Sequence, residues 1–161
     1  MSGAIEHGGV ALDVKGARVA IVAARWNAAL VDQLLEGALA ELAARGLARE
    51  AIAVLRCPGA FELPSVARRV IDTRRYDAVI CFGAVIRGDT PHFDFVAGEC
   101  ARGIAELGLR TDVPVIFGVL TTENHEQAAR RADPARDNKG AEAALAALEM
   151  VSLYRRIGGA A

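Results

Sequence analysis

Aromatic residues and cysteines are scarce in this chain of 161 residues, which has five Phe, two Tyr, one Trp and three Cys. The cysteines, Cys57, Cys81 and Cys100, are odd in number and far apart, which excludes a disulfide framework and a paired Cys-x-x-Cys metal site. We interpret them as small buried apolar side chains. With so few rings, Val, Ile, Leu and Ala must supply most of the core.

Long apolar runs and an excess of charge are also missing. No segment approaches the roughly 20 apolar residues of a membrane helix, and the N-terminus lacks the basic start and apolar run of a signal peptide. A net charge of −1, a pI near 6.3 and no basic block argue against nucleic acid as a partner. With 53% apolar and 24% charged residues, we expect one globular domain in the cytoplasm, with no contact to a membrane.

Several motifs of common enzyme classes are absent as well. The chain has no phosphate-binding Gly-x-x-x-x-Gly-Lys-[Ser/Thr] loop, no Gly-x-Gly-x-x-Gly after its first apolar run and no Gly-x-Ser-x-Gly elbow. It also has no pair of histidines at metal-ligand spacing. These absences argue against binding of nucleoside triphosphates, nicotinamide cofactors or zinc, and against serine hydrolysis.

Short apolar runs alternate with segments of helical spacing along the chain. The runs rich in Val and Ile predict strands buried on both faces at residues 18–24, 52–56, 78–86 and 113–120. Helices are predicted at residues 28–45, 63–73, 93–107, 123–132 and 139–156, with Gly46 and Gly108 ending the first and third. This order is typical of parallel βαβ units, so we expect a three-layer α/β sandwich with a four-stranded sheet.

Residues 1–16 precede the domain of residues 17–161 as a polar arm. Val10, Leu12 and Val14 alternate with Ala, Asp and Lys in the period of a strand, and no partner within the domain is evident from the sequence. The arm is therefore expected to add an edge strand to the sheet of a neighbouring subunit. The alternative is a frayed terminus.

Ligands of open α/β sheets bind beyond the carboxyl ends of the strands, and two of these ends carry aromatic and acidic side chains. Trp26, the only tryptophan, follows the first strand and offers a stacking surface for a planar heterocycle, although a lone Trp is more often a packing residue. Glu62 follows the second strand, where its carboxylate can accept hydrogen bonds from ligand hydroxyls or can serve only as a helix N-terminal carboxylate.

The third strand is followed by the richest of these loops. Asp89 and Thr90 can cap the helix that begins near Pro91, whose first turn presents N–H groups suited to a phosphate. His92 lies in the same turn, where an imidazole can move protons near neutral pH. The other two histidines, His7 and His125, lie in polar segments and are interpreted as surface residues.

A phosphate dianion also needs a cation. Arginine is favoured for its planar fork, but the residues alone do not choose among the candidates, and most of these side chains could equally belong to solvated helix faces. The candidates are Arg87, Arg130, Arg131, Arg136 and Lys139.

Four segments together resemble the lumazine synthase family, the 6,7-dimethyl-8-ribityllumazine synthases of riboflavin biosynthesis. They are PGAFELP at residues 58–64, GAVIRGDTPHFD at 83–94, FGVLTTE at 117–123 and NKGAEAA at 138–144. They follow one another in order without insertion, and the resemblance extends from about residue 18 to the C-terminus.

The resemblance implies a flavodoxin-like fold and a transferase activity. It implies condensation of 5-amino-6-(D-ribitylamino)uracil with 3,4-dihydroxy-2-butanone 4-phosphate, releasing phosphate and two waters, with no metal or organic cofactor. Related enzymes of another activity, the archaeal-type riboflavin synthases, and a catalytically weak cage-forming paralogue are the alternatives. A receiver-type binding module is disfavoured, because the first strand lacks the acidic pair and a fifth strand is missing.

The resemblance also implies a role for individual residues. The catalytic proton-transfer residue is His92. The residues implied to bind the ribitylaminouracil are Trp26, Ala60, Phe61, Glu62, Ala84, Val85, Ile86 and Phe117, the last from the adjacent subunit. Those implied to bind the butanone phosphate are Asp89, Thr90 and Arg131, with Lys139 and Glu142 in support. Trp26 replaces the Phe of many relatives, and the side-chain role of the anionic Asp89 stays open.

Assembly is implied as well. The resemblance indicates a homo-oligomer of cyclic pentamers with active sites between subunits, and the short segment at residues 133–138 favours a 60-subunit icosahedral capsid over free or paired pentamers. Riboflavin synthase is an expected partner. Three of the few aromatic residues, Trp26, Phe61 and Phe117, thus fall on implied pocket positions.

Overall fold

The computed structural model describes residues 11–158, which form four strands, five α-helices and two short 3₁₀ helices. The strands are β1 (Val19–Ala24), β2 (Ile52–Cys57), β3 (Ala78–Ile86) and β4 (Val115–Thr122). The helices are α1 (Ala28–Ala44), α2 (Leu63–Asp72), α3 (His92–Arg110), α4 (His125–Ala132) and α5 (Lys139–Ile157). The 3₁₀ turns η1 (Arg49–Ala51) and η2 (Ala60–Glu62) were not expected from the sequence.

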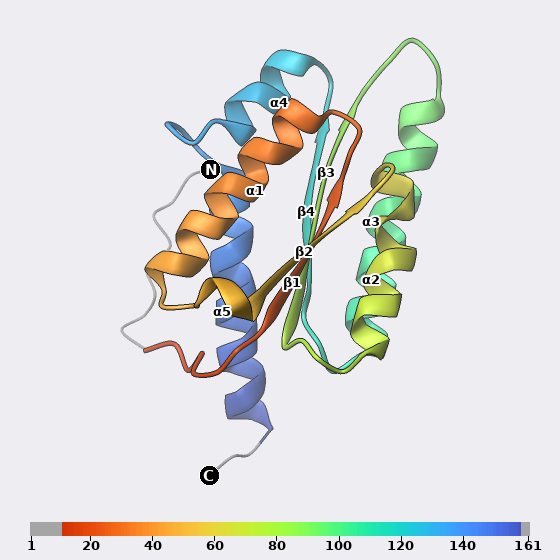
Figure 1. Ribbon diagram of the computed structural model, residues 1–161. Helices are drawn as coiled ribbons and strands as arrows, with labels where there is room; N and C mark the ends of the chain where they lie inside the picture. Colours follow the sequence, from red (N-terminus) through yellow and green to blue (C-terminus); the bar gives the residue numbers. More distant parts are fainter. Residues whose placement is uncertain (1–10, 159–161) are drawn as a thin grey trace.

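The sheet is parallel throughout, in the order β2-β1-β3-β4. Helices α1, α4 and α5 pack on one face and α2 and α3 on the other, so the molecule has three layers (Figure 1). The expected α/β sandwich with a four-stranded parallel sheet is confirmed. Its carboxyl edge carries the loops that lead into α1, α3 and α4.

Two core clusters lie on the two sides of the central strands. Alternate residues of β1 point to opposite faces: Val19 and Ile21 belong to the cluster under α1 and α5, and Ala20 and Val22 to the cluster under α2 and α3. The prediction that all strands are buried on both faces holds for β1 and is wrong for β2 and β4. These are the edge strands, so Leu55 and Phe117 remain exposed.

Helix ends explain most differences from the predicted boundaries. Gly46 ends α1 with φ +94°, as expected from its tolerance of the left-handed region. Gly108 was expected to end α3, but the helix continues to Arg110, where Thr111 Oγ1 donates to the carbonyl of Leu107 at 2.8 Å. An isolated glycine inside a helix costs only about 1 kcal/mol, which the packing of a 19-residue helix can offset.

The described part of the arm lies against its own chain. Arg155 donates from Nη1 to the carbonyls of Asp13 and Lys15 at 3.2 and 3.0 Å, and Leu12 and Val14 pack on the first core cluster. The expectation that the arm lacks a partner within the domain is therefore wrong for these residues, because α5 extends far enough to hold them. Val10 and the rest of residues 1–10 lie outside the described residues.

Candidate active site

A cavity of about 520 Å³ opens where the loops after β1, β2 and β3 converge. We call it the aromatic cavity. It is lined by Trp26, Asn27, Ala60, Phe61, Glu62, Ala84, Val85, Ile86, His92, Phe95 and Val96. Eight of the residues expected to bind the pyrimidine or to move protons are thereby brought together, and this position beyond the strand ends is where α/β sheets bind ligands.

Trp26 and Phe61 are presented to solvent by loops whose backbones are hydrogen bonded to each other. The amide of Arg25 donates to the carbonyl of Cys57 at 2.8 Å, and that of Trp26 to the carbonyl of Pro58 at 3.0 Å. These bonds continue the pairing of β1 with β2 past the last strand residues. Trp26 is 64% exposed and Phe61 56%, so both rings are available to a ligand.

Glu62 is oriented by the turn that precedes it. Its Oε2 accepts a hydrogen bond from the amide of Gly59 at 3.0 Å, while the amide of Glu62 donates to the carbonyl of Gly59 at 3.2 Å. The carboxylate therefore satisfies a local backbone donor and also lines the cavity. The two interpretations made from the sequence, ligand acceptor and local helix carboxylate, are compatible at this residue.

His92 is the first residue of α3, at the rim of the aromatic cavity. Pro91 takes the N-cap position without a side-chain cap, and the amide of His92 makes only a long bond, 3.4 Å, to Oγ1 of Thr90. The predicted cap by Asp89 and Thr90 is thus weak. Both side chains are exposed and lie outside the lining of the cavity, next to the N–H groups of the first turn.

Arg87 is held by two carboxylates. Its Nη1 lies 3.1 Å from Oδ1 of Asp94 and its Nε lies 2.8 Å from Oε2 of Glu123, while the guanidinium stacks 4.3 Å from the ring centroid of Phe93. Desolvation lowers the pKa of Arg87, but the bonds to Asp94 and Glu123 outweigh it and raise the pKa above its usual value. This arginine is a permanent cation engaged with α3 and the loop after β4, which weakens its case as a phosphate ligand.

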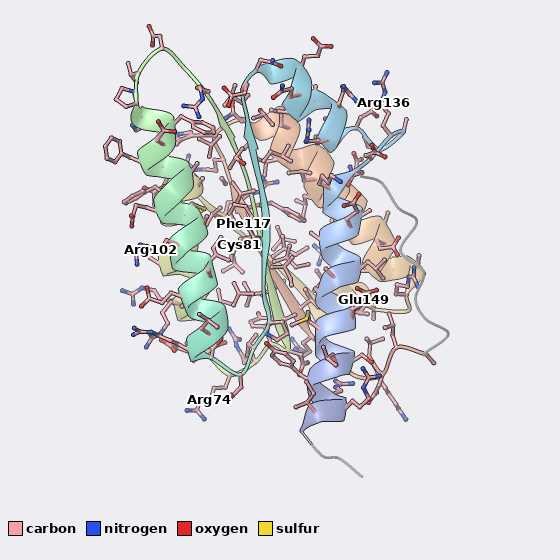
Figure 2. All side chains as sticks on the ribbon, turned by 180° about the vertical axis from the view of Figure 1, so that it is seen from behind. Arg74, Cys81, Arg102, Phe117, Arg136 and Glu149 are labelled. Atoms are coloured by element: carbon pink, nitrogen blue, oxygen red, sulfur yellow. The ribbon has the colours of Figure 1, made fainter. Side chains whose placement is uncertain are left out.

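The remaining expected residues line a second depression on β4, here named the β4 hollow. Its volume is about 440 Å³, and it contains Phe117, Arg131, Lys139 and Glu142. Arg131 donates from Nη1 to the carbonyl of Gln127 at 2.9 Å, and Lys139 is ion-paired with Glu142 at 2.9 Å. In Figure 2, Phe117 is labelled on the strand that passes between α3 and α5.

One chain therefore presents the expected site in two parts. The aromatic cavity lies on the side of α2 and α3, whereas the β4 hollow lies on the side of α4 and α5, and the two share no lining residue. Arg131 lines the β4 hollow together with Phe117, but Arg130 does not. Within one subunit, the expected phosphate arginine and the expected proton-transfer histidine do not meet in one cavity.

Asn27, Phe95 and Val96 also line the aromatic cavity and were not predicted from the sequence. Asn27 has φ +57°, and its Nδ2 donates to the carbonyl of Ala84 at 2.8 Å, which ties the loop after β1 to the end of β3. Phe95 is 68% exposed on the first turn of α3. Its spacing of three from His92 places both on one helix face, a signal that was present in the sequence.

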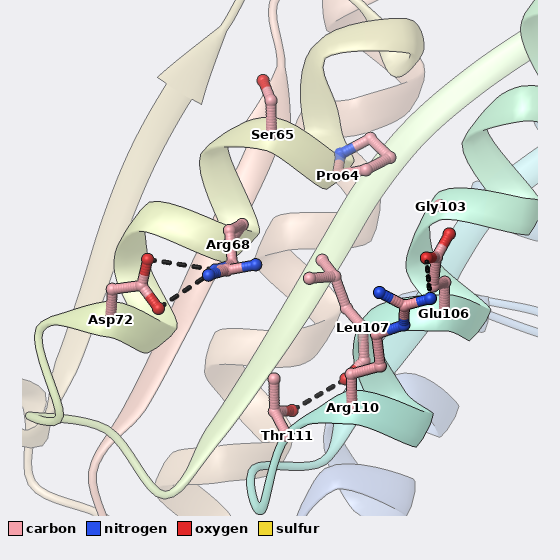
Figure 3. A pocket seen from close by; sticks show the side chains of 9 residues that line it. All are labelled: Pro64, Ser65, Arg68, Asp72, Gly103, Glu106, Leu107, Arg110 and Thr111. Carbon is pink, nitrogen blue, oxygen red and sulfur yellow. Dashed lines mark hydrogen bonds and ion pairs between the residues drawn. The ribbon is translucent and has the colours of Figure 1, made fainter.

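A further depression between α2 and α3 is distinct from both parts. Figure 3 shows that its walls carry the ion pairs Arg68–Asp72 and Arg110–Glu106, at 3.0 and 3.0 Å. Its volume, about 530 Å³, matches that of the aromatic cavity, but His92 and the exposed aromatic rings do not line it. Size alone does not identify the site.

Comparison with known proteins gives one consistent answer. Residues 16–155 match the family model described as 6,7-dimethyl-8-ribityllumazine synthase. The chain belongs to this family. A protein of that name from Chlorobium phaeovibrioides is 54% identical over 139 residues, which is 86% of this chain and 90% of the relative. One from Prosthecochloris aestuarii is 51% identical over 146 residues, 91% and 94% of the two chains.

Membership of the lumazine synthase family confirms the resemblance and the expected class of enzyme, a transferase of riboflavin biosynthesis. Within residues 11–158, no group of three or more His, Cys, Asp or Glu side chains could hold a metal ion. No helix in that range is both long and apolar enough to cross a membrane.

Proposed function

We propose that this chain condenses 5-amino-6-(D-ribitylamino)uracil with 3,4-dihydroxy-2-butanone 4-phosphate, in a site that two copies of the chain complete. The observation that carries the proposal is the aromatic cavity, in which Trp26, Glu62 and His92 face one space at the strand ends. Relatives about 50% identical over most of this chain bear the name of the enzyme that forms the lumazine product.

The pyrimidine binds in the aromatic cavity. Its flat ring stacks on Trp26, the only large ring on the loop after β1, and its polar edge faces the backbone of β3 at Ala84, Val85 and Ile86. The ribityl chain runs toward Ala60, Phe61 and Glu62, where the carboxylate accepts hydrogen bonds from hydroxyls. The exposed apolar rings favour this ligand because a planar heterocycle covers them.

The phosphate binds at the first turn of α3, beside Asp89 and Thr90. Backbone N–H groups at a helix start favour an anion there, and the carboxylate of Asp89 is accommodated if it points away from the phosphate. The nearby Arg87 is already engaged by two carboxylates. The cation therefore comes from Arg131 of a second copy, together with Phe117, Lys139 and Glu142 of the same β4 hollow.

His92 moves the protons. Attack of the pyrimidine amine on the ketone forms a carbinolamine that loses water to give an imine, elimination then releases phosphate, and ring closure releases the second water. Each step transfers a proton near the phosphate-bearing carbon, so one imidazole at the start of α3 can act first as acid and then as base. Holding both substrates in register contributes the larger part of the rate.

The assembly that this site requires is a homo-oligomer in which one copy's aromatic cavity faces the next copy's β4 hollow. A cyclic arrangement repeats such a head-to-tail contact until it closes, which suits the pentamer, and twelve pentamers form the 60-subunit capsid. Pairing of the arm with a neighbour, association with riboflavin synthase and a cytoplasmic location stay predictions.

The direct test adds both substrates to the purified protein and follows the absorbance and fluorescence of the lumazine product. Formation of 6,7-dimethyl-8-ribityllumazine with release of one phosphate per product supports the proposal. Conversion of lumazine itself into riboflavin, with no condensation, would assign the alternative riboflavin synthase activity instead. Absence of both reactions in protein that assembles into a closed shell would identify a cage-forming paralogue.

A further inference from the structure

Trp26 lies against the backbone of Gly59. A Cβ placed on Gly59 would overlap Cε3 of the indole and lie 2.6 Å from Cζ3, closer than real Cβ atoms come to any neighbour. Gly59 is buried, whereas the Trp26 side chain is 64% exposed. The ring therefore rests on a glycine at Cε3 and Cζ3, and the same side chain lines the aromatic cavity.

The backbone of Gly59 is fixed at both of its polar groups. Its amide donates to Oε2 of Glu62 at 3.0 Å, and its carbonyl accepts from the amide of Glu62 at 3.2 Å and from Sγ of Cys57 at 3.5 Å. Its φ of −145° and ψ of −176° are extended angles that any residue adopts. An alanine here is thus free of backbone strain. Its methyl group would overlap the Trp26 ring and would lie 3.3 Å from Oε2 of Glu62, a tight contact that a shift of a few tenths of an ångström relieves.

The backbone of Trp26 is fixed as well, by the bond from its amide to the carbonyl of Pro58 at 3.0 Å. With both backbones held, a methyl group on residue 59 must be accommodated by rotation of the indole. The ring then moves away from residue 59, and because Trp26 lines the aromatic cavity, this movement changes the surface that the cavity offers to a ligand.

We propose that Gly59 is a positioning residue for the pyrimidine substrate: its missing side chain lets the edge of the Trp26 ring at Cε3 and Cζ3 lie against the loop, in a position where the ring also lines the cavity. The inference rests on the proposed function, because it takes Trp26 as the stacking surface. It adds that the residue at position 59 decides whether a ring as large as indole can stack on the pyrimidine. Through its bond to Glu62, the same glycine orients both groups that flank the pyrimidine.

The test compares Gly59→Ala with the wild-type protein in steady-state kinetics for each substrate. We expect the KM for the pyrimidine amine to rise about tenfold or more, since displacement of a positioning group by about 1 Å has large effects, and the KM for the butanone phosphate to stay within about twofold. Trp26 is the only tryptophan, so its emission spectrum without substrate reports the displaced ring directly. Emission is expected to change in Gly59→Ala.

Two glycine controls separate this effect from general crowding. At Gly108 a Cβ meets no atom within 4 Å, so Gly108→Ala is expected to leave both KM values and the emission unchanged. At Gly103 a Cβ would lie 2.8 Å from Pro64, outside the aromatic cavity. Gly103→Ala is expected to lower the melting temperature without altering Trp26 emission or the ratio of the two KM values.

The decisive variant is Trp26→Phe combined with Gly59→Ala. Phenylalanine keeps a flat ring but lacks the indole carbons Cε3 and Cζ3, so the double variant is expected to have a lower KM for the pyrimidine than Gly59→Ala alone. It also stays informative if Gly59→Ala folds poorly, because it removes the overlap.

Two results would overturn the inference, provided that the wild-type protein is active. The first is a KM for the pyrimidine in Gly59→Ala within twofold of the wild-type value. The second is a double variant, Trp26→Phe with Gly59→Ala, whose KM for the pyrimidine is no lower than that of Gly59→Ala. Absence of product with the wild-type protein would instead overturn the proposed function. In that case the emission spectrum still tests the packing of Trp26 against Gly59. An unchanged spectrum in Gly59→Ala would contradict that packing.

Discussion

Nε of Arg87 donates a hydrogen bond to Oε2 of Glu123 at 2.8 Å, which joins the loop after β3 to the loop after β4. The same guanidinium reaches Asp94, two residues beyond His92 in the first turn of α3. The start of the helix that carries the histidine is thereby tied to a neighbouring strand end by a single side chain.

We predict that Arg87→Gln lowers kcat about tenfold with a small change in melting temperature. Exposed ion pairs contribute little to stability, whereas loss of the connection frees the first turn of α3 and its histidine. Arg87→Lys keeps the charge but not the two-sided fork, so partial rescue of kcat is expected.

The matched control is Arg102→Gln. Arg102 also bridges two carboxylates on α3, Glu99 and Glu106, but it lies away from the aromatic cavity. Equal losses of kcat in the two variants would show that Arg87 acts only through general helix stability.

Replacing His92 with alanine is expected to slow turnover by about 100- to 10,000-fold without abolishing it, because proton transfer is lost while both substrates remain in register. Single-turnover measurements of lumazine formation give this rate. His125→Ala, at the start of α4 and outside both parts of the site, is the control and should retain wild-type turnover. An unchanged rate in His92→Ala would refute the assignment.

Arg131→Ala should raise the KM for the butanone phosphate by about 10- to 100-fold and leave the KM for the pyrimidine nearly unchanged, because a charge-assisted bond to phosphate is lost. The neighbouring Arg130→Ala, outside the β4 hollow, serves as control. Steady-state kinetics with each substrate varied in turn distinguish them. A larger rise in the KM for the butanone phosphate in Arg130→Ala than in Arg131→Ala would assign phosphate binding to Arg130.

The three cysteines are expected to resist thiol reagents in the folded protein at pH 8 and to react once it is unfolded. All are buried, and burial raises the pKa of each thiol, that of Cys100 to about 12. The thiol of Cys100 keeps its proton to a higher pH in the folded protein than in the unfolded chain, where its pKa is near 9. The free energy of unfolding therefore has its full contribution from this thiol below pH 9 and loses it as the pH rises toward 12. Denaturation measured from pH 8 to 11 should show falling stability, less so in Cys100→Ala.

The fold was predictable from the sequence because its central elements are locally unambiguous. Runs of Val and Ile at β1 and β3 are buried on both faces, and the strand bounds of β3 agree with the prediction to the residue. The errors lie at the edges: β4 begins and ends two residues later than expected, since its pairing with β3, from Val79–Val115 to Ile86–Thr122, decides its limits. Such contacts depend on position in the sheet, which no local pattern contains.

The lining of the aromatic cavity was largely predictable from the sequence, whereas its separation from the β4 hollow was not. Strand-end reasoning placed Trp26, Glu62 and His92 together, and the structure confirms that they line one cavity. The resemblance, rather than the residues alone, singled out Arg131 from Arg130. The support of Trp26 by Gly59 could not be predicted, because it depends on the distance between two loops that are 33 residues apart in the chain.

Under the proposed function, lumazine forms where the aromatic cavity of one copy meets the β4 hollow of another. The most direct measurement is the activity of assemblies co-expressed from His92→Ala and Arg131→Ala chains, carrying different tags and purified through both. The assay is run at a butanone phosphate concentration far below the KM of Arg131→Ala. Each single-variant assembly, measured alone, sets the background.

If each site takes His92 from one copy and Arg131 from the next, random mixing leaves about one quarter of the sites with both residues intact. We therefore predict that the mixed assemblies recover about one quarter of wild-type activity. Activity no higher than the average of the two single-variant assemblies would show that both residues act within one chain, and would contradict a site shared between copies.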